Sequence, residues 1–183
     1  MILSKEELIE EFGSTFEHSP WVAEAAFEAG AFQGVARSAD GTIRLTEEEA
    51  GRIHDAMVEA FRRASHEDRL AVLRAHPDLA GRLTIARELS RDSEAEQTGA
   101  GLDRLTPDEH TRFAHLNAEY QGRFGHPFIV AVRGLDKDDI RDAFERRIGN
   151  DAESEFDEAC RHVEMIARHR LFDRVERSAA SDG

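Results

Sequence analysis

Four segments carry side chains that a plain helical bundle does not need, and the first is centred on His76. His76 precedes Pro77, and a proline disfavours helical backbone in the residue before it, so the helix carrying Leu70 and Leu73 is predicted to end at His76. The helix dipole favours a protonated imidazole at this end. His76 is therefore suited to act as a general acid or to pair with a carboxylate. The structural alternative is that it bonds only to the last helical carbonyls.

The second segment concentrates a hydroxyl, carboxylates and an amide within one turn. Ser93 and Glu96 have the spacing of a capping box, which explains both structurally. Gln97 lies outside that explanation, and the flexible residues Gly99 and Gly101 follow it. Such a segment suits recognition of a polar ring, and the two interpretations stay equally open.

The third segment is the apolar, β-branched run Phe128–Val132, which follows Gly125 and Pro127. In an all-helical protein this run has no strand to pair with, yet buried backbone groups need hydrogen-bond partners. A ligand rich in amide-like groups would supply them by lying along the backbone. The alternative is an extended core segment whose backbone is satisfied by side chains and water.

The fourth candidate is Arg170, because it continues an apolar helical stripe. Phe156, Ala159, Val163 and Ile166 follow each other by steps of three or four, and the next step of four reaches Arg170. Arginine is rarely buried without a partner. Arg170 is therefore expected to bind a substrate carboxylate with two parallel hydrogen bonds, to cap the helix, or to pair with a core Asp.

The elements that position these side chains are predicted to be helices. Capping-box spacing marks helix starts at Ser4, Thr46 and Thr106. Apolar residues at steps of three and four, together with these caps, predict helices at Leu3–Phe12, Trp21–Ala29, after Thr46, at Glu67–Ala75, after Thr106, at Asp136–Gly149 and at about Asn150–Val175. The only strong strand signal is Phe128–Val132, and a weak one covers Thr42–Leu45. The prediction is an all-α, single-domain bundle of about eight helices with one isolated extended segment near 127–132.

Charge and composition exclude several classes of function. The chain has 24 basic and 38 acidic residues, a formal net charge of −14, which disfavours both sequence-independent nucleic-acid binding and docking on anionic membranes. The single cysteine, Cys160, makes no internal disulfide and leaves no cysteine-based zinc site. With no signal peptide and no apolar run of membrane length, a soluble intracellular domain is expected. Lys5 and Lys137 are the only lysines, which fits a high-salt cytoplasm or a biased genome composition.

A set of short motifs occurs in a fixed order along the chain, from about Leu8 to Leu171. The motifs are Ser19–Ala26, Ala75–Gly81, Leu83-Thr84, Ser93-x-x-Glu-Gln97, Ala100–Asp103, Phe113-x-x-Leu-Asn117, Tyr120-x-x-Arg-Phe-Gly125, Pro127–Val132, Arg147-x-x-Asn150 and Arg170-Leu171. As an ordered set they resemble the OHCU decarboxylase family, which acts on 2-oxo-4-hydroxy-4-carboxy-5-ureidoimidazoline (OHCU) in urate breakdown. His126 departs from the aromatic residue that the family usually has at this position, and it is expected to add a titrating group near the site.

The resemblance implies an all-α fold of the OHCU decarboxylase type over residues 1–176, followed by a frayed tail at 177–183. It also implies a homodimer in the cytoplasm and decarboxylation to (S)-allantoin and CO₂ with no cofactor and no metal. His76 matches the family's catalytic histidine, with Glu96 and Arg170 as further catalytic or carboxylate-orienting groups. Substrate contacts are expected from Pro77, from Ser93, Glu94, Ala95, Glu96 and Gln97, and from the backbone of Phe128, Ile129, Val130, Ala131 and Val132.

Two alternatives compete with this interpretation. A non-catalytic acidic helical adaptor would use an apolar groove to bind partner helices. A related ureido-ring lyase would keep the fold and change the chemistry.

Overall fold

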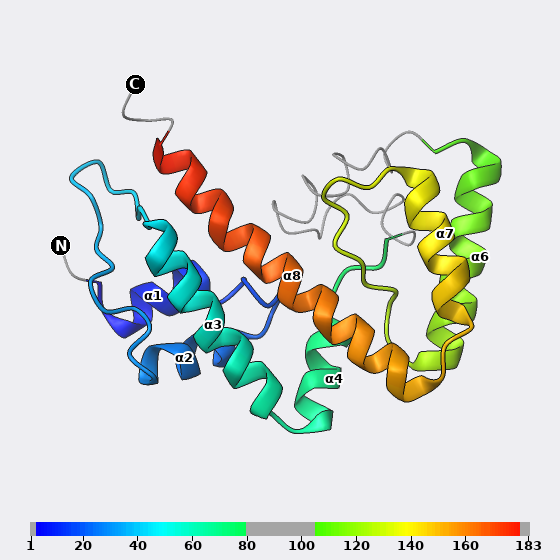
Figure 1. Ribbon diagram of the computed structural model, residues 1–183, viewed down its shortest axis with the longest axis horizontal. Helices are drawn as coiled ribbons and strands as arrows, with labels where there is room; N and C mark the ends of the chain where they lie inside the picture. Colours follow the sequence, from blue (N-terminus) through cyan, green and yellow to red (C-terminus); the bar gives the residue numbers. More distant parts are fainter. Residues whose placement is uncertain (1–2, 80–104, 180–183) are drawn as a thin grey trace. The chain divides into compact units, whose positions relative to one another are not determined.

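The computed structural model describes residues 3–79 and 105–179, with side chains up to residue 175. These residues form seven α-helices: α1 (Lys5–Phe12), α2 (Pro20–Glu28), α3 (Glu47–Arg63), α4 (His66–Ala75), α6 (Pro107–Phe124), α7 (Lys137–Ile148) and α8 (Ala152–Ala179) (Figure 1). The described residues contain no strand, and the weak signal at Thr42–Leu45 yields only an isolated antiparallel bridge between Arg37 and Ile43. The all-α prediction is confirmed.

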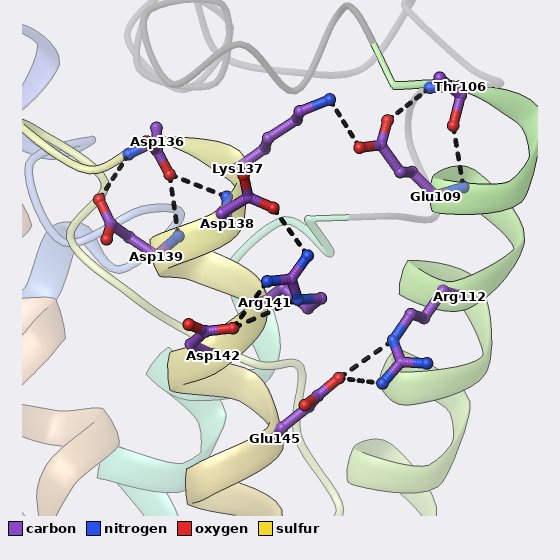
Figure 2. Close-up of polar contacts among 10 residues, drawn as sticks. All are labelled: Thr106, Glu109, Arg112, Asp136, Lys137, Asp138, Asp139, Arg141, Asp142 and Glu145. Atoms are coloured by element: carbon purple, nitrogen blue, oxygen red, sulfur yellow. Dashed lines mark hydrogen bonds and ion pairs between the residues drawn. The ribbon is translucent and has the colours of Figure 1, made fainter.

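Local capping explains where the helices begin. Ser4, Thr46 and Thr106 each accept a hydrogen bond from the backbone N–H three residues on, and the glutamate there accepts one in return. A fourth box opens α7, where Asp136 Oδ1 accepts the N–H groups of Asp138 and Asp139 at 2.9 Å (Figure 2). The capping boxes predicted at Ser4, Thr46 and Thr106 are therefore confirmed.

The chain divides into two compact units, which are described separately. The first unit, 1–75 and 164–183, contains α1 to α4 and the C-terminal part of α8. Its core includes Phe12, Phe16, Ile53, Met57 and Phe61, all with essentially no exposed surface. The rings of Phe16 and Phe61 are in contact, with centroids 5.4 Å apart. Phe16 lies in the loop that follows α1, so its packing against Phe61 anchors that loop.

The second unit, 76–163, contains α6, α7 and the N-terminal part of α8. α6 and α7 lie side by side (Figure 1), and Figure 2 shows the ion pairs between them, Lys137 to Glu109 at 2.6 Å and Arg112 to Glu145. The core of this unit is a cluster of aromatic and aliphatic side chains from these helices, the segment between them and the residues after α4: Leu79, Phe113, Leu116, Tyr120, Phe128, Val130, Val132, Ile140 and Phe144.

The segment 127–132 has neither helical nor strand backbone, as expected for an isolated extended run. Its even-numbered residues Phe128, Val130 and Val132 belong to the core cluster, and Phe128 stacks on Phe144 with ring centroids 3.7 Å apart. Packing of alternate side chains therefore anchors this segment. Among the described residues, none of the helices has the combination of length and apolar character needed to cross a bilayer.

Candidate active site

His76 is the first residue after α4, which ends at Ala75, so the predicted helix end before Pro77 is confirmed. Its side chain is buried, with 6% of the residue exposed. The residues after it are anchored on both sides: Asp78 accepts a hydrogen bond of 3.0 Å from Gln121 of α6, and Leu79 joins the core. The imidazole is thereby held out of bulk water at the negative end of a helix, which suits proton transfer or carboxylate binding.

Arg170 is also buried, and its partner is an acid. Its Nη2 donates to Glu17 Oε1 at 2.6 Å, and Nη1 lies 3.4 and 3.5 Å from the carbonyl oxygens of Ser14 and Thr15. Pairing with a buried acid, one of the three roles predicted for Arg170, is present, although the acid is a glutamate in the α1–α2 loop and not an aspartate.

Glu17 has an unusual backbone conformation. Its φ is +44°, and within residues 3–79 and 105–179 no other non-glycine residue has a positive φ. A side chain in this left-handed region costs about 1–2 kcal/mol because Cβ approaches the following carbonyl. The carboxylate is 3% exposed and faces a buried guanidinium, so the ion pair offsets a local strain. No residue type or spacing in the sequence distinguishes Glu17 from the other acidic residues.

Side chains form hydrogen bonds with three main-chain groups of segment 127–132. The Ile129 carbonyl accepts a hydrogen bond of 2.7 Å from Arg147 Nη1, and the Ala131 N–H donates to His162 Nδ1 at 3.2 Å. At the preceding turn, His126 Nδ1 donates to the Pro127 carbonyl at 2.9 Å. The structural alternative, in which side chains satisfy the buried backbone, therefore applies at Ile129 and Ala131.

Arg147 is fully buried in a polar cluster with Glu155. Its Nε and Nη2 both donate to Glu155 Oε1, at 3.0 and 2.6 Å, and its guanidinium lies 4.5 Å from the centre of the Phe128 ring. The Glu155 carboxylate also accepts from the Tyr120 hydroxyl and from Asn150 Nδ2. A buried ion pair with this many hydrogen bonds is rigid, and breaking it from one side is costly.

His162 and Tyr120 both have shifted pKa values, and burial is the larger cause in each case. Burial, and then the nearby charge of Arg147, lower the pKa of His162 to about 4. His162 is therefore neutral at pH 7, as it must be for Nδ1 to accept the Ala131 N–H. Burial, and then the hydrogen bond to Glu155, raise the pKa of Tyr120 above its ordinary value, so its hydroxyl stays a donor.

The sequence contains one signal for this cluster, a second stripe along α8. Glu155, Glu158 and His162 follow at steps of three and four along α8, which places them in a polar stripe beside the apolar one. A polar stripe next to the buried apolar stripe of a helix indicates an internal polar partner. The motif Arg147-x-x-Asn150 supplies that partner, since Asn150 Nδ2 contacts both Glu155 and Glu158.

The remaining predicted site residues, Ser93, Glu94, Ala95, Glu96 and Gln97, lie outside the described residues. Among the side chains that the structure does describe, no group of three or more His, Cys, Asp or Glu residues is arranged to hold a metal ion.

The chain is similar to known proteins both in sequence and in fold. The family model described as OHCU decarboxylase matches residues 2–172. A Haloferax volcanii protein named 2-oxo-4-hydroxy-4-carboxy-5-ureidoimidazoline decarboxylase is 38% identical over 94% of this chain and 91% of its own length. The Mus musculus protein of the same name is 34% identical over 91% of this chain and 85% of its own.

Two solved structures have the same fold. A crystal structure of (S)-allantoin synthase matches with a TM-score of 0.69 and 28% identity, over 94% of this chain and 51% of that one, so this chain spans about half of the synthase. A crystal structure of OHCU decarboxylase in the presence of (S)-allantoin matches with a TM-score of 0.64 over 89% of this chain and 96% of that one; at 16% identity this is a likeness of fold alone. By its sequence match along nearly the whole length, the chain belongs to the OHCU decarboxylase family.

Proposed function

We propose that this protein decarboxylates OHCU to (S)-allantoin and CO₂ in urate breakdown. The observation that carries the proposal is the 38% identity with a decarboxylase of that name, spread over 94% of this chain. The ordered motifs of the family are present, and two of the residues they single out, His76 and Arg170, are buried polar side chains.

The substrate chemistry explains why this reaction needs no cofactor. The carboxylate of OHCU is attached to a carbon next to a ring C=N bond, so the electron pair left by departing CO₂ flows into that imine. The protein has to hold the breaking C–C bond perpendicular to the ring and then deliver a proton to one face. Both tasks are matters of alignment, and binding contacts supply alignment.

Each candidate residue has a proposed role in these tasks. His76 holds the carboxylate and then donates the proton, a role supported by its burial at the C-terminal end of α4. Glu96 orients or deprotonates the 4-hydroxyl group and fixes the tautomer of His76. Arg170 binds an oxygen of the substrate, and its pairing with Glu17 supports this role because the guanidinium is already oriented. Pro77, residues 93–97 and the backbone of 128–132 grip the ring and the ureido group.

The test of the reaction is the optical activity of the product. OHCU is generated from urate by the two upstream enzymes, this protein is added, and circular dichroism of the allantoin is followed. Spontaneous decay gives a racemate and no signal, so a rapidly rising signal of the S product is the expected result. A flat trace in both low and molar salt would refute the proposed reaction and favour the adaptor.

The role of His76 is tested by His76→Ala in the same assay. General acid–base catalysis contributes about 10²- to 10⁴-fold, so a loss of this size is expected. His115→Ala is the matched control, because His115 is exposed on α6 and has no proposed role. If His76→Ala keeps nearly the wild-type rate, His76 is not the proton donor.

Three further statements belong to the proposal. Residues 1–176 act as one domain, which predicts a single cooperative unfolding transition. The protein is a homodimer, which light scattering after gel filtration checks. Its location is cytoplasmic, which fractionation of the source cells checks.

A further inference from the structure

Asn117 is a polar side chain in the buried face of α6. The residue is 4% exposed, and the other buried residues of this helix are all apolar or aromatic. Within the described residues, 3–79 and 105–179, the amide oxygen Oδ1 of Asn117 has no hydrogen-bond partner. A buried acceptor without a partner destabilises a fold, because it has given up its water for nothing in return. Asparagine is also a poor helix former, so neither packing nor helix propensity accounts for this residue.

The face of α6 that carries Asn117 meets the residues that follow His76. Gln121 is one helical turn further along this face, and its Nε2 donates to Asp78 at 3.0 Å. Leu79 packs in the same core cluster as the other buried residues of α6. All of these residues belong to the second unit. Asn117 therefore lies on the side of α6 that contacts the chain two and three residues after the candidate proton donor.

The substrate has N–H groups that need acceptors. OHCU carries them in its ring and in its ureido group, and they lose water when the substrate is bound. The two candidate side chains within the described residues supply donors instead, because a guanidinium has only donors and a histidine that gives up a proton is a donor as well. An amide oxygen has two lone pairs and is suited to accept an N–H.

We infer that Asn117 is a further substrate-binding residue, whose Oδ1 accepts a hydrogen bond from an N–H group of OHCU. The inference rests on the proposed function and extends it by adding a side chain of α6 to the candidate site. The buried oxygen gains its partner when the substrate binds, which explains why a destabilising residue is kept at this position. A site built in this way also selects for substrates that carry the N–H group, because an analogue without it leaves the oxygen unpaired.

The first test removes the acceptor with two apolar substitutions. Asn117→Leu keeps a branched side chain, and Asn117→Ala avoids crowding in the core. Each is expected to lower kcat/KM about tenfold, the effect of one hydrogen bond, and to weaken by a similar factor the binding of (S)-allantoin, which retains N–H groups in its ring and ureido group. At least one of the two is expected to have a Tm equal to or above that of wild type, because the unpaired oxygen and the poor helix former are both gone.

The controls separate binding from stability. Asn150 is the only other asparagine in the chain, and its Nδ2 donates to Glu155 at 2.8 Å and to Glu158 at 3.2 Å. Asn150→Leu breaks these hydrogen bonds and is expected to lower Tm. His115→Leu, at an exposed position of α6, is expected to leave kcat/KM unaltered. If both Asn117 variants lose as much Tm as Asn150→Leu, the Asn117 amide is held by the folded chain and the inference is overturned.

The second test observes the amide itself. Selective ¹⁵N labelling of asparagine in the full-length protein gives side-chain NH₂ signals from Asn117 and Asn150 alone. The Asn117 signal, assigned by its loss in Asn117→Leu, is expected to shift progressively as (S)-allantoin is added, and the Asn150 signal to shift much less. An unmoved Asn117 signal at saturating (S)-allantoin would contradict the contact.

Activity distinguishes a failure of the inference from a failure of the proposed function. All variants are assayed well below their unfolding temperatures, with the folded state checked by circular dichroism. If wild type makes (S)-allantoin and both Asn117 variants keep nearly its kcat/KM, the inference is wrong and the proposed function stands. If wild type makes no (S)-allantoin, the proposed function and the inference fail together.

Discussion

Replacing Glu17 with glycine is expected to leave the protein more stable than replacing it with alanine, the reverse of the usual order for these residues. The expectation follows from the φ of +44° at Glu17. Both substitutions remove the carboxylate that pairs with Arg170 at 2.6 Å, where both side chains are at most 5% exposed. Removing one partner of a buried ion pair costs about 3–5 kcal/mol, and this cost is common to the two variants.

The difference between the variants comes from the backbone. Alanine in the left-handed region costs about 1–2 kcal/mol, which glycine avoids. Glycine gains more freedom in the unfolded chain, which costs it about 0.5–1 kcal/mol. The balance favours glycine by about 0.5–1 kcal/mol in the free energy of unfolding. For a chain of 183 residues, 1 kcal/mol corresponds to about 2–4 °C in Tm.

The assay is urea denaturation followed by circular dichroism, with thermal scans of the same variants. Glu119 provides the matched control, because it is exposed within α6, where alanine should be more stable than glycine by about 1 kcal/mol. Glu17→Gln measures the loss of charge without a change in side-chain size. If Glu17→Ala is as stable as Glu17→Gly or more stable, the strain argument is refuted.

Three further predictions concern the core, a titrating group and the surface. Phe144→Ala removes a fully buried ring stacked on Phe128 and should lower the free energy of unfolding, measured by urea denaturation, by about 3–5 kcal/mol. Phe27 is only partly buried, and a loss in Phe144→Ala no greater than that in Phe27→Ala would contradict this packing. Burial lowers the pKa of His162 to about 4 from its ordinary 6.5, so the unfolded chain takes up the proton first as the pH falls. The contribution of His162 to stability is therefore present above pH 6.5 and is lost as the pH falls towards 4. The difference in unfolding free energy between wild type and the non-titrating His162→Asn should fall over this window, and a constant difference would count against it. The net charge of −14 makes the folded chain repel itself, and salt screens this repulsion. Tm should therefore rise between 0.1 and 1 M NaCl, as the Debye length shrinks from about 10 to 3 Å. An unchanged or lower Tm would show that self-repulsion does not significantly destabilise the fold.

Local features of the sequence were sufficient for most of the fold. Caps and apolar steps of three and four act within a few residues, so the capping boxes at Ser4, Thr46 and Thr106 and the end of α4 before Pro77 could be predicted. The capping box at the start of α7 was not predicted, because Asp136 takes the place of the usual Ser or Thr and Asp139 that of the usual Glu. The β-branched run at 127–132, for which the sequence offers no partner strand, predicted a segment outside the helices, and the structure has neither helix nor strand there.

The sequence by itself also singled out His76 and Arg170, because a proline and a helical stripe are visible along the chain. It did not determine which side chains hold the candidate site. Arg170 meets Glu17 across 153 residues, and Ala131 meets His162 across 31. Such pairings depend on which polar groups are buried next to each other in the folded protein, and residues this far apart in the sequence meet only through tertiary packing. Only the tertiary structure therefore decided that Arg170 pairs with a strained glutamate and that Arg147 and His162 bond to the main chain of segment 127–132.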